Sequence, residues 1–196
     1  MNEAEVTLAI LAGGRGERMG KAKSLLRVGN QPILTYLLER FAWRGPTMLV
    51  NSPGREKPPG SEHFDFEVVD PVEGMGPVRG LMTAMENLKT EILVVASVDM
   101  PGVGREQLKW LRQNLEGRPQ SCGLMLKREE IEPFPSIFRK TRAGCPWYDA
   151  GHRSMRSLSK VPGFAVVSAP EDWRSQVWTN LNQPGDLAAF ESFRIP

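Results

Sequence analysis

The sequence predicts an α/β fold, with a Rossmann-like open, mostly parallel sheet that has helices on both faces. Three observations predict it. Apolar runs of strand length alternate with segments whose apolar residues recur at helical spacing. The two most apolar runs, 6–12 and 92–98, lack the alternation of half-exposed strands, which favours strands buried on both faces. Turns rich in glycine or proline follow several of these runs, at the strand ends where such sheets bind ligands.

The first half of the chain is expected to alternate strands and helices. One helix should have Asn30 as its N-cap and an apolar stripe over 33–41. Further helices are expected over 78–88 and 108–115, where apolar residues again share one face. The segment 52–61 is rich in proline and glycine and predicts an exposed loop. The strands expected in this half are 6–12, 47–51, 66–69 and 92–98.

The second half has a weaker pattern, with strands expected at 123–126, 136–139 and 164–167. The chain has no visible internal repeat and no convincing linker. A single domain over 1–196 is therefore expected, with a nucleotide-binding half of about 1–117 and an acceptor-side half of about 118–196.

Composition argues against several classes of function. The formal net charge is only +2, whereas nucleic-acid binding requires a strongly basic face. No apolar stretch reaches the roughly 18 residues of a membrane span, and the acidic start lacks the basic lead of a signal peptide. A cytoplasmic protein is expected, without nucleic acid or membrane as a partner. The spacing of the two cysteines and two histidines favours neither a disulfide nor a zinc site.

The segment Leu11–Lys23 is the strongest functional signal. It holds four glycines and four basic residues between an expected strand and an expected helix. Glycines let backbone N–H groups turn toward an anion, and Arg and Lys supply the compensating charge. The dinucleotide fingerprint fails at Met19, and the Walker pattern fails at Arg15 and Ala22. The segment therefore predicts a phosphate loop of another kind, with a solvated flexible turn as the alternative.

Asp99 is the second candidate, because it follows the 92–98 strand directly. Ligands of open α/β sheets bind beyond the carboxyl ends of the strands. A carboxylate there can hold Mg²⁺, which commonly takes one or two carboxylates together with phosphates and waters. The alternative is that Asp99 caps the helix that follows Pro101.

Two further turns fit a ligand site but also have ordinary explanations. Asp70 and Gly76 lie in a turn that enters a helix, and the amino end of a helix favours anions. In Trp178–Leu187, the asparagines at 180 and 182 could ligate a hard cation or bond a phosphate. Common loop chemistry accounts for the first turn equally well, and capping by Asn182 accounts for the second.

Taken in order, these four features resemble the nucleotidyltransferases that make the dinucleotide form of molybdenum cofactor, most closely the molybdenum cofactor guanylyltransferase family. The resemblance spans nearly the whole chain. The family's first motif, close to L-A-G-G-x-S-x-R-M-G-x-x-K-x-L, is matched from Leu11 to Leu25, with Gly16 in place of serine. Its D…G-P-x-x-G, D-x-P and N-x-N-T-P-x-D-L segments are matched from Asp70 to Gly80, from Asp99 to Pro101 and from Asn180 to Leu187, with Gln183 in place of threonine.

The resemblance implies a fold of the nucleotide-diphospho-sugar transferase type and transfer of GMP from GTP to molybdopterin, with Mg²⁺ as cofactor and pyrophosphate as product. It implies catalytic roles for Arg18, Lys23 and Asp99, and a metal held by Asp99 and Asn182. The residues implied at the nucleotide are Leu11, Ala12, Gly13, Gly14, Lys23, Asp70, Gly76 and Asp99.

The donor and acceptor are less sharply defined. Gly13 stands where cytidylyltransferase relatives usually have alanine, which favours guanine. On the acceptor side the expected residues are Asn180, Asn182, Arg153 and Arg156, the two arginines being chosen for their charge alone. Molybdoenzymes or their maturation factors are the expected protein partners. Two alternatives remain: transfer from CTP or to a sugar phosphate by an enzyme of the same fold, and a non-catalytic molybdopterin-binding accessory protein.

Overall fold

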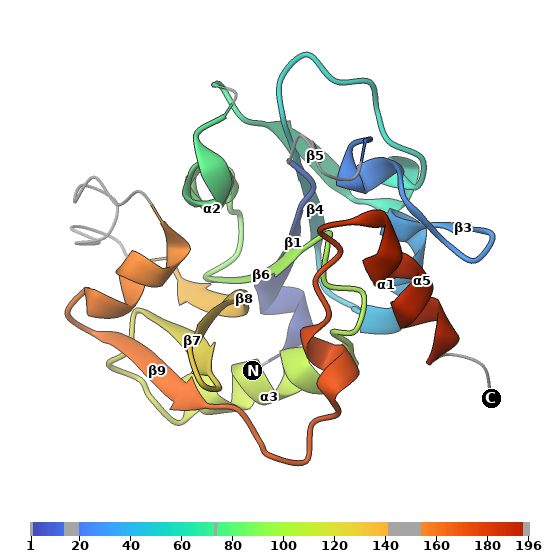
Figure 1. Ribbon diagram of the computed structural model, residues 1–196. Helices are drawn as coiled ribbons and strands as arrows, with labels where there is room; N and C mark the ends of the chain where they lie inside the picture. The colour runs from blue at the N-terminus through green and yellow to red at the C-terminus, as the bar shows by residue number, and fades with distance from the viewer. Residues whose placement is uncertain (1, 14–19, 73, 141–153, 194–196) are drawn as a thin grey trace.

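The computed structural model describes residues 2–13, 20–72, 74–140 and 154–193, which Figure 1 shows in colour. At its centre is a seven-stranded sheet in the order β5 (Phe66–Val69), β4 (Thr47–Asn51), β1 (Val6–Leu11), β6 (Ile92–Ser97), β8 (Ile131–Arg139), β7 (Gly123–Lys127) and β9 (Phe164–Ser168). Strands β5, β4, β1 and β6 run parallel, and so do β7 and β9, whereas β8 is antiparallel to both neighbours. The expected open, mostly parallel sheet is confirmed.

Helices lie on both sides of this sheet. Helix α2 contacts β1, β4, β5 and β6, and Figure 1 shows α1 and α5 on the opposite side. Helix α1 also contacts α3. A two-stranded ribbon, β2 with β3, precedes α1. The bounds are α1 (Ile33–Phe41), α2 (Gly76–Glu86), α3 (Arg105–Glu116), α5 (Pro184–Ser192), β2 (Arg27–Val28) and β3 (Gln31–Pro32).

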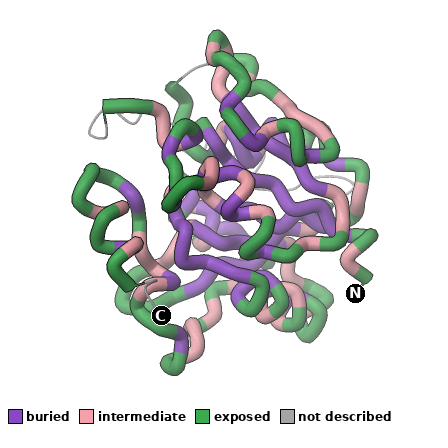
Figure 2. Tube along the Cα trace, turned by 90° about the vertical axis from the view of Figure 1, so that its right-hand side faces the viewer, coloured by how far each residue is buried: buried purple, intermediate pink, exposed green. Residues whose placement is uncertain are grey.

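The two most apolar runs of the sequence become adjacent central strands. β1 and β6 pair in parallel from Val6 opposite Ile92 to Leu11 opposite Ser97. Every residue of β1 is buried, and β6 is buried except at Ser97. Full burial of one Val, Leu or Ile side chain contributes about 1.5–3 kcal/mol, so these strands anchor the core. Figure 2 shows the buried strands at the centre, with most exposed residues on the surrounding helices and loops.

Two local expectations were wrong. Asn30 is not the N-cap of α1, because the next two residues pair as β3 with β2 and the helix begins directly after Pro32. The 52–61 loop is not exposed throughout, since Pro58 and Gly60 are buried. A Cβ on Gly60 would lie 2.6 Å from Thr35 Oγ1 on α1, so the loop packs closely on that helix.

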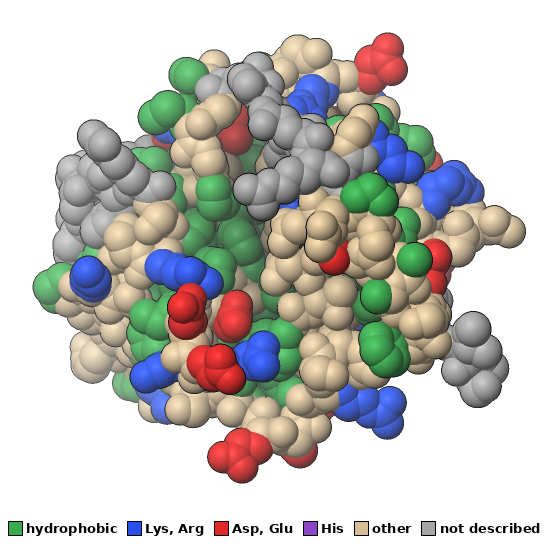
Figure 3. Space-filling model, in the orientation of Figure 1, with side chains coloured by type: hydrophobic (Ala, Val, Ile, Leu, Met, Phe, Trp, Pro, Cys, Tyr) green, Lys and Arg blue, Asp and Glu red, His purple; other side chains and the backbone are tan. Residues whose placement is uncertain are grey.

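Two features of the described residues concern membrane spans and surface charge. Within the ranges the structure describes, no helix is both long and apolar enough to cross a membrane. On the face shown in Figure 3, acidic and basic side chains are interspersed instead of gathered by sign.

Candidate active site

The candidate residues collect where parallel strands end. Because β1, β4, β5 and β6 run in the same direction, their carboxyl ends share one edge of the sheet. Backbone hydrogen bonds extend this pairing past the strands: Ala12 N–H donates to Val50 O at 2.8 Å, and Val98 N–H donates to Leu11 O at 3.1 Å. Asp70 N–H likewise donates to Asn51 O at 2.9 Å. The predicted residues after these strands therefore lie along one edge of the sheet, where β4 and β1 stand between the strands that lead to Asp70 and Asp99.

Lys23 is the centre of this site. It begins the short 3₁₀ turn η3 (Lys23–Leu25), which follows the glycine-rich loop. Its Nζ donates to Asp99 Oδ2 at 2.6 Å and to Asn182 Oδ1 at 2.8 Å. The side chains of Lys23 and Asp99 are only 17% and 18% exposed, so solvent screens this ion pair less than an open surface pair. Three segments far apart in sequence thus meet at one ammonium group.

Asp99 is held on both sides. Its Oδ1 accepts from Ser97 Oγ at 2.5 Å, and its backbone oxygen accepts from Leu181 N–H at 2.8 Å. Asp99 does not cap the next helix, because the N-cap of α3 is Gly104. Its carboxylate therefore faces Lys23 in a geometry fixed by the end of β6.

Asn182 is held by Asp186. The Asp186 Oδ2 accepts from the backbone N–H groups of Asn182 at 2.7 Å and Gln183 at 2.8 Å. These bonds to the ionised form lower the pKa of Asp186 from its ordinary value of 3.8. Gln183, not Asn182, is the N-cap of α5. The Asn182 side chain reaches Lys23 instead.

The carboxyl group of Asp70 is partly buried and incompletely hydrogen-bonded. Burial raises the pKa of its carboxyl above the ordinary value of 3.8, although the Thr83 hydroxyl and the Arg79 guanidinium oppose this effect. Its Oδ1 is buried without a hydrogen-bond partner among the described residues. A carboxyl whose pKa is raised in this way at a strand end is typical of functional sites.

Two glycines lie where another segment approaches closely. A Cβ at Gly13 would lie 2.7 Å from Ser52 Oγ, and one at Gly80 would lie 3.3 Å from Leu11 Cδ2. Gly80 thus lets α2 approach β1, while Gly13 lets the loop after β1 approach the end of β4. Glycine at position 13 therefore has a reason within the protein, independent of any base.

The oxygen ligands suit a hard cation. Asp99 Oδ2 and Asn182 Oδ1 both contact a positively charged group, the Lys23 ammonium, which stands in for a cation between them. Carboxylate and amide oxygens are ligands that Mg²⁺ accepts, with phosphates and waters completing its shell. The residues present therefore fit the expected metal.

Comparison with known proteins shows the family of the chain. The model of the MobA-like NTP transferase domain matches residues 8–174, which is most of the chain. The chain belongs to the MobA-like NTP transferase family. It is thus a nucleotidyltransferase, and the resemblance seen in its motifs is confirmed.

Its relatives carry a more specific name. A molybdenum cofactor guanylyltransferase of Syntrophotalea carbinolica is 29% identical, over 94% of this chain and 89% of the relative. A second molybdenum cofactor guanylyltransferase, of Shewanella halifaxensis, is 36% identical over 86% of this chain and 92% of the relative. The solved structure of molybdopterin-guanine dinucleotide biosynthesis protein A from Archaeoglobus fulgidus has a TM-score of 0.79 at 22% identity, covering 96% of this chain and 98% of that one. This last likeness establishes the fold.

The expected residues of this MobA-like protein do not all meet at Lys23. Asn180 is exposed, and its Nδ2 donates to Trp178 O at 3.4 Å. Arg156 Nε donates to Ile131 O at 2.8 Å, and its Nη1 lies 3.1 Å from Glu130 Oε2. Arg156 is thus occupied by the start of β8.

Other expected residues lie at the edge of the site or outside what is described. Gly76 is exposed at the first position of α2, with a φ of +73° that favours glycine. Leu11 is buried at the end of β1. Gly14, Arg18 and Arg153 lie outside the described residues.

Sequence reasoning missed two polar residues at the strand ends. Asn51 ends β4, its Nδ2 donating to Glu67 Oε1 at 3.2 Å and its Oδ1 accepting from Ser52 N–H at 3.0 Å. Ser97 ends β6 and bonds Asp99. The rule that singled out Asp99, a polar residue at the carboxyl end of a parallel strand, would also have found Asn51 and Ser97. Asp186 was matched to a motif, but its contact with Asn182 depends on the fold.

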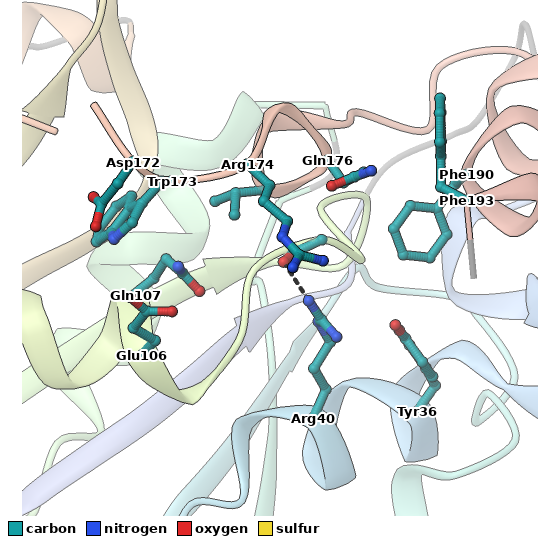
Figure 4. Close-up of a pocket in the computed structure, with 12 residues that line it drawn as sticks. Tyr36, Arg40, Glu106, Gln107, Asp172, Trp173, Arg174, Gln176, Phe190 and Phe193 are labelled. Atoms are coloured by element: carbon teal, nitrogen blue, oxygen red, sulfur yellow. Dashed lines mark hydrogen bonds between the residues drawn. The ribbon is translucent and has the colours of Figure 1, made fainter. Parts of the chain in front are cut away.

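A separate cavity of about 320 Å³ lies between α1, α3 and the C-terminal segment (Figure 4). Arg40 and Arg174 project into it together with Tyr36 and Trp173. Arg40 is already occupied, since its Nε and Nη2 donate to the backbone oxygens of Val103 and Gly102 at 2.9 and 2.8 Å. None of the described candidate residues lines this cavity, so the chemistry is assigned to the strand ends.

Proposed function

We propose that this chain transfers GMP from GTP to molybdopterin with release of pyrophosphate. The observation that carries the proposal is the Lys23 ammonium, held between Asp99 and Asn182 and preceded in sequence by a glycine-rich segment. The guanine donor and molybdopterin acceptor come from the names of the relatives. We place the reaction in the cytoplasm, with molybdoenzymes or their maturation factors receiving the product.

The protein groups would act on the triphosphate by charge and position. Backbone N–H groups of the loop after Leu11 would face phosphate oxygens, since glycines leave them uncovered. Lys23 and Arg18 would offset the charge that develops on the transferred phosphoryl group and on the leaving pyrophosphate. Asp70 would bond the nucleotide through its buried carboxyl.

The reaction needs no strong base. An oxygen of the molybdopterin phosphate attacks the α-phosphorus of GTP, a new P–O bond forms, and the bond from the α-phosphorus to the bridging oxygen breaks as pyrophosphate leaves. A phosphomonoester is largely dianionic at neutral pH, because its second pKa is about 6. Proton removal by a side chain is therefore unnecessary, and catalysis depends on alignment and electrostatics.

Asp99 and Asn182 would hold Mg²⁺ through Oδ2 and Oδ1, the atoms that now contact the ammonium. Bound Mg²⁺ neutralises charge on phosphate oxygens. Lys23 would then leave Asp99 and turn to the phosphates, while Ser97 continues to hold the other carboxylate oxygen.

The donor nucleotide has an alternative to GTP. Because Ser52 Oγ alone accounts for glycine at position 13, that glycine no longer argues strongly against a cytidine donor. Guanine is favoured by the names of the relatives, and CTP is the second candidate.

A two-step experiment tests the proposal. Thermal unfolding with Mg²⁺ and each of GTP, CTP, ATP and UTP ranks the donors, because a ligand stabilises the folded state in proportion to its saturation. Pyrophosphate release is then measured with molybdopterin present and absent. GTP should give the largest shift and a release that depends on molybdopterin. A larger shift with CTP would favour the second candidate, and tight molybdopterin binding without release from any nucleotide would favour an accessory protein.

A further inference from the structure

The segment 181–186 contacts both Asp99 and Lys23. Leu181 is fully buried, and its N–H donates to the backbone oxygen of Asp99 at 2.8 Å. The next residue, Asn182, directs its side-chain oxygen at Lys23 Nζ. This segment is therefore attached to the same strand end that carries the candidate metal ligand.

The ammonium of Lys23 has three protons to donate. Among the residues that the structure describes, it has two acceptors, Asp99 Oδ2 and Asn182 Oδ1. Two fixed acceptors restrict where a long, flexible side chain can place its charge before a nucleotide and its metal bind. The position of Asn182 thus sets the direction of Lys23.

Asp186 in turn fixes Asn182. An acidic residue in the first turn of a helix ordinarily bonds the N–H of the N-cap residue, here Gln183. In this chain the same Oδ2 also accepts the N–H of Asn182 at 2.7 Å, one residue before the cap. The two backbone hydrogen bonds lower the pKa of Asp186 most, and the Lys23 charge adds a smaller lowering.

We propose that Asp186 is a positioning residue for Lys23 and acts through Asn182. The C-terminal motif would then serve the nucleotide side of the site, by fixing the lysine that meets the triphosphate. The effect on nucleotide binding rests on the function proposed above, whereas the effect on Lys23 itself does not.

The first test needs no nucleotide. Lysine acylation by an N-hydroxysuccinimide ester is followed by mass spectrometry at Lys23, with the exposed Lys21 as reference in the same molecule. We expect Lys23 to react several-fold more slowly than Lys21 in the wild type, because it is held and shielded. Asp186→Ala and Asn182→Ala should both raise the Lys23 rate relative to Lys21, and Asp172→Ala, at an exposed position, should not. An unchanged ratio in Asp186→Ala would overturn the proposal.

The second test is a double-mutant cycle on the affinity for GTP with Mg²⁺, combining Asp186→Ala with Lys23→Met. If Asp186 acts through Lys23, Asp186→Ala weakens binding about 5- to 20-fold in the wild type and less than about 2-fold when Lys23 is already absent. Asp186→Asn retains an acceptor oxygen and should recover part of the GTP affinity that Asp186→Ala loses. This variant also serves as a control for loss of α5 structure. Equal losses in both backgrounds would overturn the positioning role. If the wild type binds no nucleotide, the proposed function fails, and the acylation ratio still decides the role of Asp186.

Discussion

Lys23 Nζ and Asp99 Oδ2 lie 2.6 Å apart, although 76 positions separate the two residues in sequence. The contact joins the segment after the glycine-rich loop to the end of β6, and it places a cation where a nucleotide and its metal would meet. Each group is a candidate to bind part of an anionic, metal-bound ligand, so each is expected to change its partner when the ligand enters.

Lys23→Met should weaken nucleotide binding about 10- to 100-fold. The substitution keeps a long apolar stem but removes the charge that would face the phosphates, and one hydrogen bond to a charged group contributes about 1.5–3 kcal/mol. Lys21→Met is the matched control, since Lys21 is exposed two positions away. Titration calorimetry with GTP and Mg²⁺ compares the two variants. Equal affinities for GTP would show that Lys23 does not bind the nucleotide.

Metal binding should depend on nucleotide. Since the ammonium contacts Asp99 Oδ2, a divalent ion alone must displace it, whereas a triphosphate offers Lys23 new acceptors. Electron paramagnetic resonance of Mn²⁺ should therefore show weak binding to the wild type alone and at least about 10-fold tighter binding with GTP.

Lys23→Met tests this coupling between metal binding and nucleotide binding. Lys23→Met leaves Asp99 open, so it should bind Mn²⁺ in the absence of nucleotide more tightly than the wild type does. Asp99→Asn should bind weakly under both conditions. A wild type that binds Mn²⁺ equally well with and without GTP would contradict the exchange of partners.

Asp70→Asn should stabilise the protein at neutral pH while weakening nucleotide binding. Burial raises the pKa of Asp70 in the folded state above 3.8, so the folded protein holds this proton more tightly than the unfolded chain. The stability that Asp70 contributes is therefore present below pH 3.8 and is lost as the pH rises through its folded pKa. The variant's gain in melting temperature should appear at neutral pH and vanish near about pH 3. A gain independent of pH would show that ionisation of Asp70 is not its cause.

Gly13→Ala should create a local clash that a second change relieves. The added Cβ would lie 2.7 Å from Ser52 Oγ, so the serine must turn away, and a strained side-chain angle would cost about 0.5–1.5 kcal/mol. Gly13→Ala with Ser52→Ala should regain that stability in chemical denaturation. If the double variant is as unstable as Gly13→Ala, the glycine has a different role.

Strand and helix positions could be predicted where hydrophobic periodicity is strong. The runs at 6–12 and 92–98 were recognised because strands buried on both faces need uninterrupted apolar residues. The start of α1 was missed because a local capping signal at Asn30 lost to the pairing of β3 with β2. β8 was predicted only from residue 136, whereas it begins at Ile131, since prolines within it hide the strand.

The sequence indicated candidate residues for the site but not the contacts between them. Asp99 followed from the strand-end rule, and Lys23 from the charge and glycine content of its segment. That Asn182 would bond Lys23, and Asp186 the backbone of Asn182, depends on where α5 lies in the fold. No spacing along the chain encodes that placement.

The fate of the α-phosphate of GTP tests the central claim most directly. GTP labelled at the α-phosphorus is incubated with Mg²⁺, molybdopterin and the wild type, Lys23→Met or Lys21→Met. We predict that the wild type and Lys21→Met move the label into a molybdopterin dinucleotide and release unlabelled pyrophosphate, and that Lys23→Met does so at least about 100-fold more slowly. Label that stays in GTP with the wild type, or transfer at the same rate by Lys23→Met, would contradict the account.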